Sequence, residues 1–203
     1  MSARGVRGRY APSPSGSLHL GNLRTALLAW LFARSVCGGF ILRVEDLDHP
    51  RVSPGAVASM LDDLRWLGLD WNEGPGRGGA YGPYVQSQRA ALYAAALDRL
   101  RRAERVYPCF CSRAELAQVA GAPHAGEEGR PYPGTCGRLS SIERQRRVRE
   151  GRQFSWRFRV PDGEISFRDA VAGDIREETS RTVGDFVVRR ADGVFAYQLA
   201  VVV

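Results

Sequence analysis

The fold is decided by residues 9–22, which read RYAPSPSGSLHLGN. Residues 7–11 are typical of a short strand, and the Pro and Gly residues of the loop that follows, 12–16, exclude regular structure. A helix comes next, because large apolar residues recur at helical spacing until a pair of glycines ends the pattern. Those apolar residues are Leu20, Leu23, Leu27, Trp30 and Leu31. His19 and Gly21 are therefore expected at a helix N-terminus, where an anion can bind, although a histidine there often serves only as a cap.

The alternation of strand and helix continues along the chain. Residues 40–44 predict a buried strand, which ends in an acidic group that begins with Glu45. A Ser-Pro pair then opens a second helix, and a third helix is predicted over 87–103. This order favours an α/β fold with a doubly wound, Rossmann-type parallel sheet. Ligands bind such sheets at the carboxyl ends of the strands, where the loop 12–16 and Glu45 both fall.

The composition indicates an ordinary globular chain with a local excess of positive charge. Its 203 residues, 44% of them hydrophobic, are enough for one domain or for one domain with an insertion. All 29 basic residues are Arg, and 14 of them lie within 99–159 beside only 6 acidic residues. Such a segment suits a polyanion such as RNA, and a genome that favours Arg explains it equally well. With no signal peptide or spanning segment, we expect a cytoplasmic monomer that makes no membrane contact.

An insertion is predicted after the third helix. The nucleotide-binding core is expected to occupy 1–105 and 161–203, and the insertion 106–160. The insertion contains three cysteines, a stretch rich in Gly and Pro, and an Arg-rich helix. A capping box, Ser140-x-x-Glu143, predicts where that helix begins.

The last part of the chain is predicted to form strands. Residues 154–160 alternate as a strand does, and Asp192-Gly193 is typical of a hairpin turn. An apolar strand is expected over 194–203. Because the chain stops inside this predicted strand, we expect it to be truncated.

The cysteines indicate a metal site rather than disulfides, because the chain carries no secretion signal. Cys37, alone at the end of an apolar helix, is expected in the core. Cys109, Cys111 and Cys136 can converge on one tetrahedral zinc ion if the intervening loop folds back, or they can remain free thiols. Ordinary zinc chemistry nominates His124 as the fourth ligand.

Residues 9–22 resemble the glutamyl version of the class I synthetase signature. His19 to Asn22 stand where that family has the tetrapeptide His-Ile-Gly-His, and Asn22 departs from the pattern but can still donate a hydrogen bond. Three further stretches continue the resemblance, 42–48, 67–75 and 82–89. Family membership implies ATP-dependent activation of L-glutamate for transfer to tRNA, with Mg²⁺ accompanying ATP.

The resemblance also implies roles for individual residues. Residues matching Arg9, Ala11 and Ser13 line the glutamate and ATP site, and the planar fork of an arginine suits a carboxylate. The remaining candidates are Glu45 for the substrate ammonium, Tyr197 for a hydrogen bond to glutamate, and His19, Gly21 and Asn22 on the side of the ATP phosphates. Without the family motifs, Glu45 would be interpreted as a solvated acid and Tyr197 as a packed strand residue.

The insertion resembles one branch of the family. The spacing Tyr132-x-x-x-Cys136 is similar to the zinc site of glutamyl-queuosine tRNA(Asp) synthetases, where a tyrosine completes the ligand set. We therefore expect a structural zinc held by Cys109, Cys111, Tyr132 and Cys136. The branch implies transfer of glutamate to queuosine in tRNA(Asp). The alternatives are part of an ordinary glutamyl-tRNA synthetase acting on tRNA(Glu) and a non-catalytic, zinc-stabilised RNA-binding module.

One family signature has no counterpart in the chain. Class I synthetases carry a second, lysine-rich loop that neutralises the ATP phosphates, and this sequence contains no Lys. We expect that loop to lie beyond Val203 or to have been lost.

Overall fold

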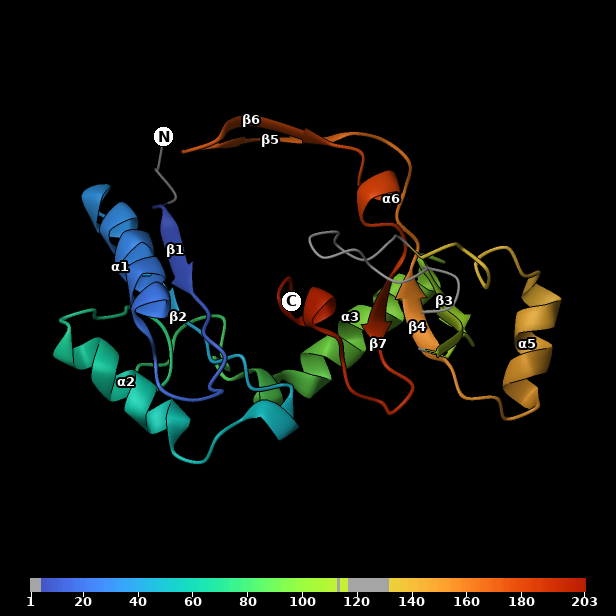
Figure 1. Cartoon of the computed structure of the whole chain (residues 1–203), viewed down its shortest axis with the longest axis horizontal. Coiled ribbons are helices and arrows are strands. Elements are labelled where there is room, and N and C mark those ends of the chain that lie inside the picture. Colours follow the sequence, from blue (N-terminus) through green and yellow to red (C-terminus); the bar gives the residue numbers. More distant parts are fainter. Residues whose placement is uncertain (1–4, 113, 117–131) are drawn as a thin grey trace. The chain divides into compact units, whose positions relative to one another are not determined.

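The computed structural model describes residues 5–112, 114–116 and 132–203. It divides the chain into two compact units, Met1–Ala90 and Ala91–Val203, whose elements are labelled in Figure 1. A search of the described helices for one long and apolar enough to cross a membrane finds none.

The first unit is built on parallel strands joined by helices, as the sequence predicts. Its elements are β1 (Arg7–Tyr10), α1 (Leu20–Ser35), β2 (Gly39–Leu42), η1 (His49–Arg51), α2 (Ala56–Trp66) and η2 (Gln86–Arg89). β1 and β2 pair in parallel from Arg7 opposite Gly39 to Tyr10 opposite Leu42. Two isolated parallel bridges, Ile41 to Glu73 and Val44 to Val85, extend the pairing beyond β2.

The core of this unit lies between the strands and the two helices. Phe40 and Leu42 of β2 are buried in one cluster with Met60 and Leu64 of α2. On the α1 side the contact is closer, because a Cβ added at Gly8 would meet the Cβ of Ala33 at 2.9 Å. Glycine at this point of β1 therefore lets the helix backbone approach the strand directly.

Cys37 is exposed, so the prediction of a core cysteine is wrong. The residue follows the end of α1 and has a left-handed backbone with φ of 53°. Gly38 N donates to Ala33 O at 2.8 Å there, closing the helix end as the chain turns into β2. The Cys37 side chain is exposed at this turn.

The second unit contains a small antiparallel sheet and a separate hairpin. α3 (Ala90–Arg102) begins at the boundary of the units, and the remaining elements are β3 (Val106–Cys109), α5 (Ser141–Arg149), β4 (Ser155–Phe158), β5 (Ile165–Asp169), β6 (Gly173–Glu177), α6 (Thr179–Thr182), β7 (Phe186–Arg189) and α7 (Tyr197–Ala200). β3, β4 and β7 lie side by side in that order, and β5 pairs only with β6 (Figure 1). β7 thus shares a sheet with two strands of the predicted insertion; the insertion boundaries themselves stay predictions.

Helix α5 begins where the sequence predicts. The Ser140 hydroxyl oxygen accepts a hydrogen bond from the Glu143 N–H at 3.1 Å, which caps the helix.

The end of the chain differs from the prediction. The turn at Asp192-Gly193 is present, and Arg190 N donates to Val194 O at 2.8 Å across it. The strand predicted over 194–203 is wrong, because only Phe195 pairs, with Arg189, before α7 starts. The consecutive residues Leu199 and Ala200 are both buried in this helix. In a strand with one buried face, consecutive side chains point to opposite faces, so only one of the two would be buried.

Candidate functional site

The loop 12–16 is fixed at the carboxyl edge of the parallel strands. Glu45 N donates to Pro12 O at 2.9 Å, which joins the loop to the chain leaving β2. Ser53 holds the other side, since its N–H donates to Pro14 O at 3.0 Å and its hydroxyl to Ser15 O at 3.0 Å. Both prolines of the loop are buried, and Ser13 between them is exposed. The loop is therefore packed against the unit by its prolines and presents a polar side chain at the surface.

His19 caps helix α1 in this structure. Its Nδ1 accepts a hydrogen bond from Gly21 N at 3.1 Å, while the Asn22 Oδ1 accepts one from His19 N at 3.3 Å. Because Nδ1 is an acceptor, the proton of the neutral imidazole lies on Nε2, which remains a donor. A Cβ at Gly21 would meet the imidazole Cε1 at 2.9 Å, so glycine is needed for this arrangement.

Glu45 is not a solvated acid. Its side chain is buried together with those of Arg43 and Gln86, with 9%, 6% and 0% of their surfaces exposed. Arg43 Nε donates to Glu45 Oε1 at 2.8 Å. Gln86 Nε2 donates to Oε1 at 3.0 Å and to Oε2 at 2.9 Å. A carboxylate oxygen can accept more than one hydrogen bond, so a further donor such as an ammonium group can share the Glu45 carboxylate with these residues.

A second acidic residue fixes the segment that carries Gln86. Asp46 accepts hydrogen bonds from the backbone N–H of Ser87 at 2.8 Å and from its hydroxyl at 2.6 Å. Two successive acids after β2 are therefore matched to two successive polar residues at the start of η2. This pairing holds the Glu45 carboxylate in one orientation.

The other predicted substrate residues fall into both units. Arg9 and Ser13 are exposed and Ala11 is half-buried, all in the unit that holds Glu45. Tyr197 begins α7 in the second unit and is 63% exposed, so it is not a packed strand residue. The assigned substrate roles of these residues stay predictions.

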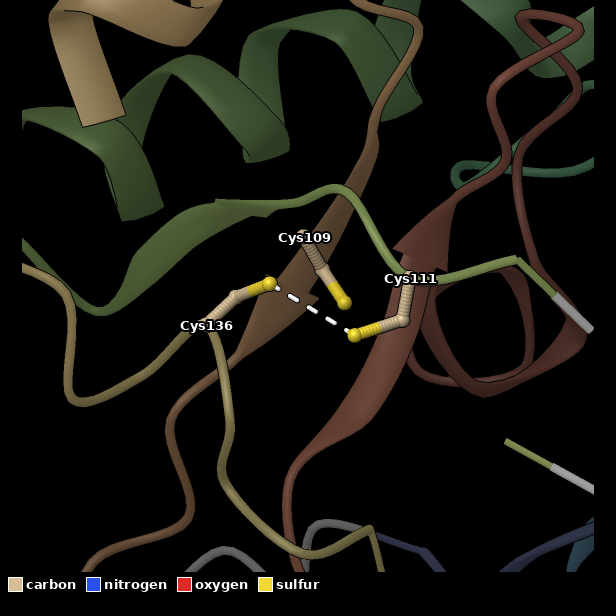
Figure 2. A group of neighbouring side chains, drawn as sticks. All are labelled: Cys109, Cys111 and Cys136. Atoms are coloured by element: carbon tan, nitrogen blue, oxygen red, sulfur yellow. Dashed lines mark hydrogen bonds between the residues drawn. The ribbon is translucent and has the colours of Figure 1, made fainter. Parts of the chain in front are cut away.

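The three cysteines of the predicted insertion converge, as the sequence predicts. Their sulfur atoms all lie within 4.8 Å of one another, and Cys111 Sγ is 3.6 Å from Cys136 Sγ. Figure 2 shows the three thiols pointing toward a common centre. The Tyr132 hydroxyl lies 3.4 Å from Cys109 Sγ and 3.5 Å from Cys111 Sγ, while His124 lies outside the described residues.

Three of these distances are close to the ligand spacing around a tetrahedral zinc ion, namely Cys111 Sγ to Cys136 Sγ and the Tyr132 oxygen to the sulfurs of Cys109 and Cys111. Zn–S bonds of about 2.3 Å and Zn–O bonds of about 2.1 Å place tetrahedral ligands about 3.8 Å apart for two sulfurs and about 3.6 Å apart for sulfur and oxygen. Cys136 N also donates to the Tyr132 oxygen at 2.8 Å, and Phe110 N to Cys136 Sγ at 3.4 Å. Such N–H donors stabilise anionic ligands. A cavity of about 670 Å³ borders Cys109 and Cys111 and offers a path for a metal ion.

The protonation of the cluster is uneven. Burial opposes ionisation of Cys109, but hydrogen bonds from the Tyr132 hydroxyl and the Cys111 N–H, together with Arg157, outweigh it and lower the pKa of this thiol. Burial raises the pKa of the Cys111 thiol to about 11. Burial, followed by the hydrogen bond with Cys109, also raises the pKa of Tyr132. A bound cation would favour the ionised ligands.

Three residues of these sites were not singled out from the sequence. Arg43 and Gln86 lie inside the stretches that carry the family resemblance, which was the available signal. Arg157, on the predicted strand 154–160, has no sequence signal of its own. Each of the three is buried beside a functional candidate.

Comparisons with known proteins agree with this geometry. The model of the family "tRNA synthetases class I (E and Q), catalytic domain" matches residues 5–203. A Glutamyl-Q tRNA(Asp) synthetase of Symbiobacterium thermophilum is 57% identical over 97% of this chain and 61% of the relative. One of Nitratidesulfovibrio vulgaris is 52% identical over 98% of this chain and 61% of the relative.

Ordinary glutamate ligases also match. Glutamate–tRNA ligase 1 of Halorhodospira halophila is 49% identical over 97% of this chain and 41% of the relative. The crystal structure of a glutamate tRNA ligase from Elizabethkingia meningosepticum, in complex with its amino acid, superposes with a TM-score of 0.83 at 33% identity, covering 98% of this chain and 41% of that one. The chain spans 61% of the length of the two Glutamyl-Q relatives above. Its sequence over 5–203 and its Rossmann-like α/β fold place it in the class I tRNA synthetases (E and Q), within their catalytic domain.

Proposed function

We propose that the protein activates L-glutamate with ATP and transfers it to queuosine in the anticodon of tRNA(Asp). The observation that carries the proposal is the arrangement in the first unit. A buried carboxylate, Glu45, lies at the edge of the strands where the loop 12–16 leads into the N-terminus of α1. Such a site can hold an ammonium group and a phosphate group close together.

Each part of the two substrates has a candidate partner. The ammonium of glutamate would donate to the Glu45 carboxylate, and Arg9 would hold a carboxylate through its planar fork. The ATP phosphates would lie at the first turn of α1, with His19 Nε2–H as a further donor. Mg²⁺ bound with ATP would neutralise part of the phosphate charge.

The reaction needs no covalent enzyme intermediate. An oxygen of the glutamate α-carboxylate attacks the α-phosphorus, and the bond to the bridging oxygen of the β-phosphate breaks. Pyrophosphate leaves and glutamyl-adenylate remains bound. The residues of the loop and of α1 act by positioning the reactants and stabilising negative charge on the phosphates.

A cationic face in the second unit supports an RNA partner. Arg144 and Arg149 of α5 line a groove of about 630 Å³ together with Arg159 and Trp156. The guanidinium of Arg159 lies 4.9 Å from the ring centre of Tyr107, so aromatic and cationic groups alternate there. Phosphates and unstacked bases bind such surfaces.

We also propose a structural zinc ion held by Cys109, Cys111, Tyr132 and Cys136. The support is the fit of the sulfur and oxygen positions to tetrahedral geometry. Because protein ligands fill all four positions, the ion would link β3 to the turn before α5. It would stabilise the fold without taking part in the chemistry.

The test uses the whole protein. ATP–pyrophosphate exchange with glutamate measures activation, and charging of queuosine-containing tRNA(Asp) against tRNA(Glu) identifies the acceptor. We expect exchange and preferential charging of tRNA(Asp). Charging of tRNA(Glu) alone would indicate an ordinary glutamate ligase. Absence of exchange from folded protein, with and without tRNA, would favour a non-catalytic RNA-binding module.

A further inference from the structure

A buried arginine lies against the tyrosine of the proposed zinc site. Arg157 on β4 is 6% exposed, and its guanidinium carbon is 3.8 Å from the ring centre of Tyr132. Its terminal nitrogen donates to the backbone oxygen of Asp185 at 2.7 Å. Within the described part of the chain, its Nε is buried without a hydrogen-bond partner. None of the ion pairs found among the described residues includes Arg157.

The surrounding sheet holds this arginine in place. Arg157 stands opposite Tyr107 of β3 and Val187 of β7, in the middle of the three strands. The Asp185 carboxylate accepts hydrogen bonds from the Tyr107 hydroxyl at 2.6 Å and from Val160 N at 2.8 Å. Arg157 contacts Asp185 at its backbone oxygen and not at this carboxylate. Its guanidinium lies over the ring of Tyr132, next to the cysteine cluster.

A cation at this position can compensate the negative charge of the proposed zinc centre. A zinc ion with three thiolates has a net charge of about −1, and with a tyrosinate as fourth ligand about −2. A buried net charge costs several kcal/mol unless an opposite charge or hydrogen bonds compensate it. Backbone N–H donors supply part of the compensation at Cys136 and at Tyr132. Arg157 is the buried cation in contact with the tyrosine ring.

We propose that Arg157 is a positioning residue of the metal centre, whose guanidinium stacks on Tyr132 and supplies the positive charge that lets the tyrosine oxygen bind the metal. The inference rests on the zinc site proposed above. It adds that the tyrosine ligand depends on a residue of a different strand that itself binds no metal.

The test compares zinc affinity in competition with a chromophoric chelator for the wild type and three variants. Arg157→Gln removes the charge but keeps a donor for the Asp185 oxygen, and Arg157→Lys keeps the charge but loses the planar fork. Arg159→Gln is the matched control, because Arg159 is exposed two residues along and stacks on Tyr107. We expect a loss of about 10- to 100-fold for Arg157→Gln, a smaller loss for Arg157→Lys, and a change below about 2-fold for the control.

A double variant separates a role through the tyrosine from general support of the fold. In a Tyr132→Phe background, Arg157→Gln should change zinc affinity by less than about 3-fold, since the group it acts on is gone. A second readout is the tyrosinate band in the ultraviolet difference spectrum on metal addition, which should weaken in Arg157→Gln at saturating zinc. If Arg157→Gln does not fold, the same spectrum of Arg157→Lys, against wild type, replaces it.

The outcomes are distinct. Unchanged zinc affinity and an unchanged tyrosinate band in folded Arg157→Gln would overturn the inference, and so would an equal loss of affinity in both backgrounds. A wild-type protein that binds no zinc would overturn the zinc site and the role of Arg157 together. Exchange and charging of the wild type are measured separately, so failure of the proposed activity is distinguishable from failure at this site.

Discussion

Substitution of Glu45 by Gln should destabilise the protein as well as weaken glutamate binding. The side chains of Arg43 and Glu45 are 8% and 6% exposed, and Nε and Oε1 are 2.8 Å apart. Glu45→Gln removes the negative charge and leaves the buried guanidinium without its carboxylate. Removing one partner of a buried ion pair costs about 3–5 kcal/mol of the free energy of unfolding. The new amide also places N–H groups toward the Gln86 Nε2 donor, which adds to the loss.

The pair can be tested as a unit with a double-mutant cycle. If the cost arises from the buried pair, Arg43→Met should be less destabilising in the Glu45→Gln protein than in the wild type. The difference should be about 1–3 kcal/mol, the range found for residues in direct contact. Equilibrium unfolding in urea, followed by tryptophan fluorescence, measures each corner of the cycle.

The functional effect is measured on the whole protein under conditions where every variant is folded. Loss of a charge-assisted bond to the substrate ammonium, about 1.5–3 kcal/mol, corresponds to a rise of about 10- to 150-fold in the KM for glutamate. The KM for ATP should change little. A free energy of unfolding within about 1 kcal/mol of wild type would refute the buried-pair reasoning, and an unchanged glutamate KM would remove Glu45 from the substrate site.

Further predictions concern the metal, acid stability and the helix cap. Tyr132→Phe should lower zinc content measured by metal analysis more than His124→Ala, and the reverse order would exclude the tyrosine ligand. Hydrogen bonds from Tyr84 and Arg7 hold the pKa of Glu73 below its ordinary value of 4.5. The stability that these contacts provide is therefore present above pH 4.5 and is lost as the pH falls through the lower pKa of the folded protein. Between about pH 6 and pH 3, Glu73→Gln should therefore lose less stability than the wild type, as measured by unfolding in urea. Gly21→Ala should displace the His19 imidazole, lower the free energy of unfolding by about 0.5–2 kcal/mol and reduce ATP–pyrophosphate exchange. Normal exchange in this variant would show that the helix cap is not needed for glutamate activation.

The sequence predicts the first unit well because local signals there agree with one another. Helix ends, the Pro-rich loop and the apolar strand all lie close to their predicted positions. The buried face of α1 differs from the apolar pattern: Leu20, Leu27 and Leu31 are exposed, while Ala26 and Ala33 are fully buried. Periodicity identifies a helix, but it does not reveal that the helix approaches a strand so closely that only small residues fit between them.

The second unit shows where local signals fail. The run 194–203 is rich in β-branched residues, yet the burial of Leu199 and Ala200 on one side of a short helix prevails. Convergence of the cysteines could be predicted because zinc chemistry limits the spacing. The position of Arg157 beside Tyr132 could not, because it depends on how β4 pairs with β3.

Asn22, where this chain departs from the family tetrapeptide, takes part in the cap of helix α1. Its Oδ1 accepts the His19 N–H, while His19 Nδ1 accepts the Gly21 N–H, so the two side chains close the first turn of α1 reciprocally. Because the amide oxygen of Asn22 accepts the capping hydrogen bond, its NH₂ group is the part that can donate to another partner. A histidine at this position carries its donor on a larger, titratable ring. If the ATP phosphates bind at this turn, as proposed, Asn22 would offer them a neutral donor whose charge does not change with pH, and positive charge would have to come from other groups.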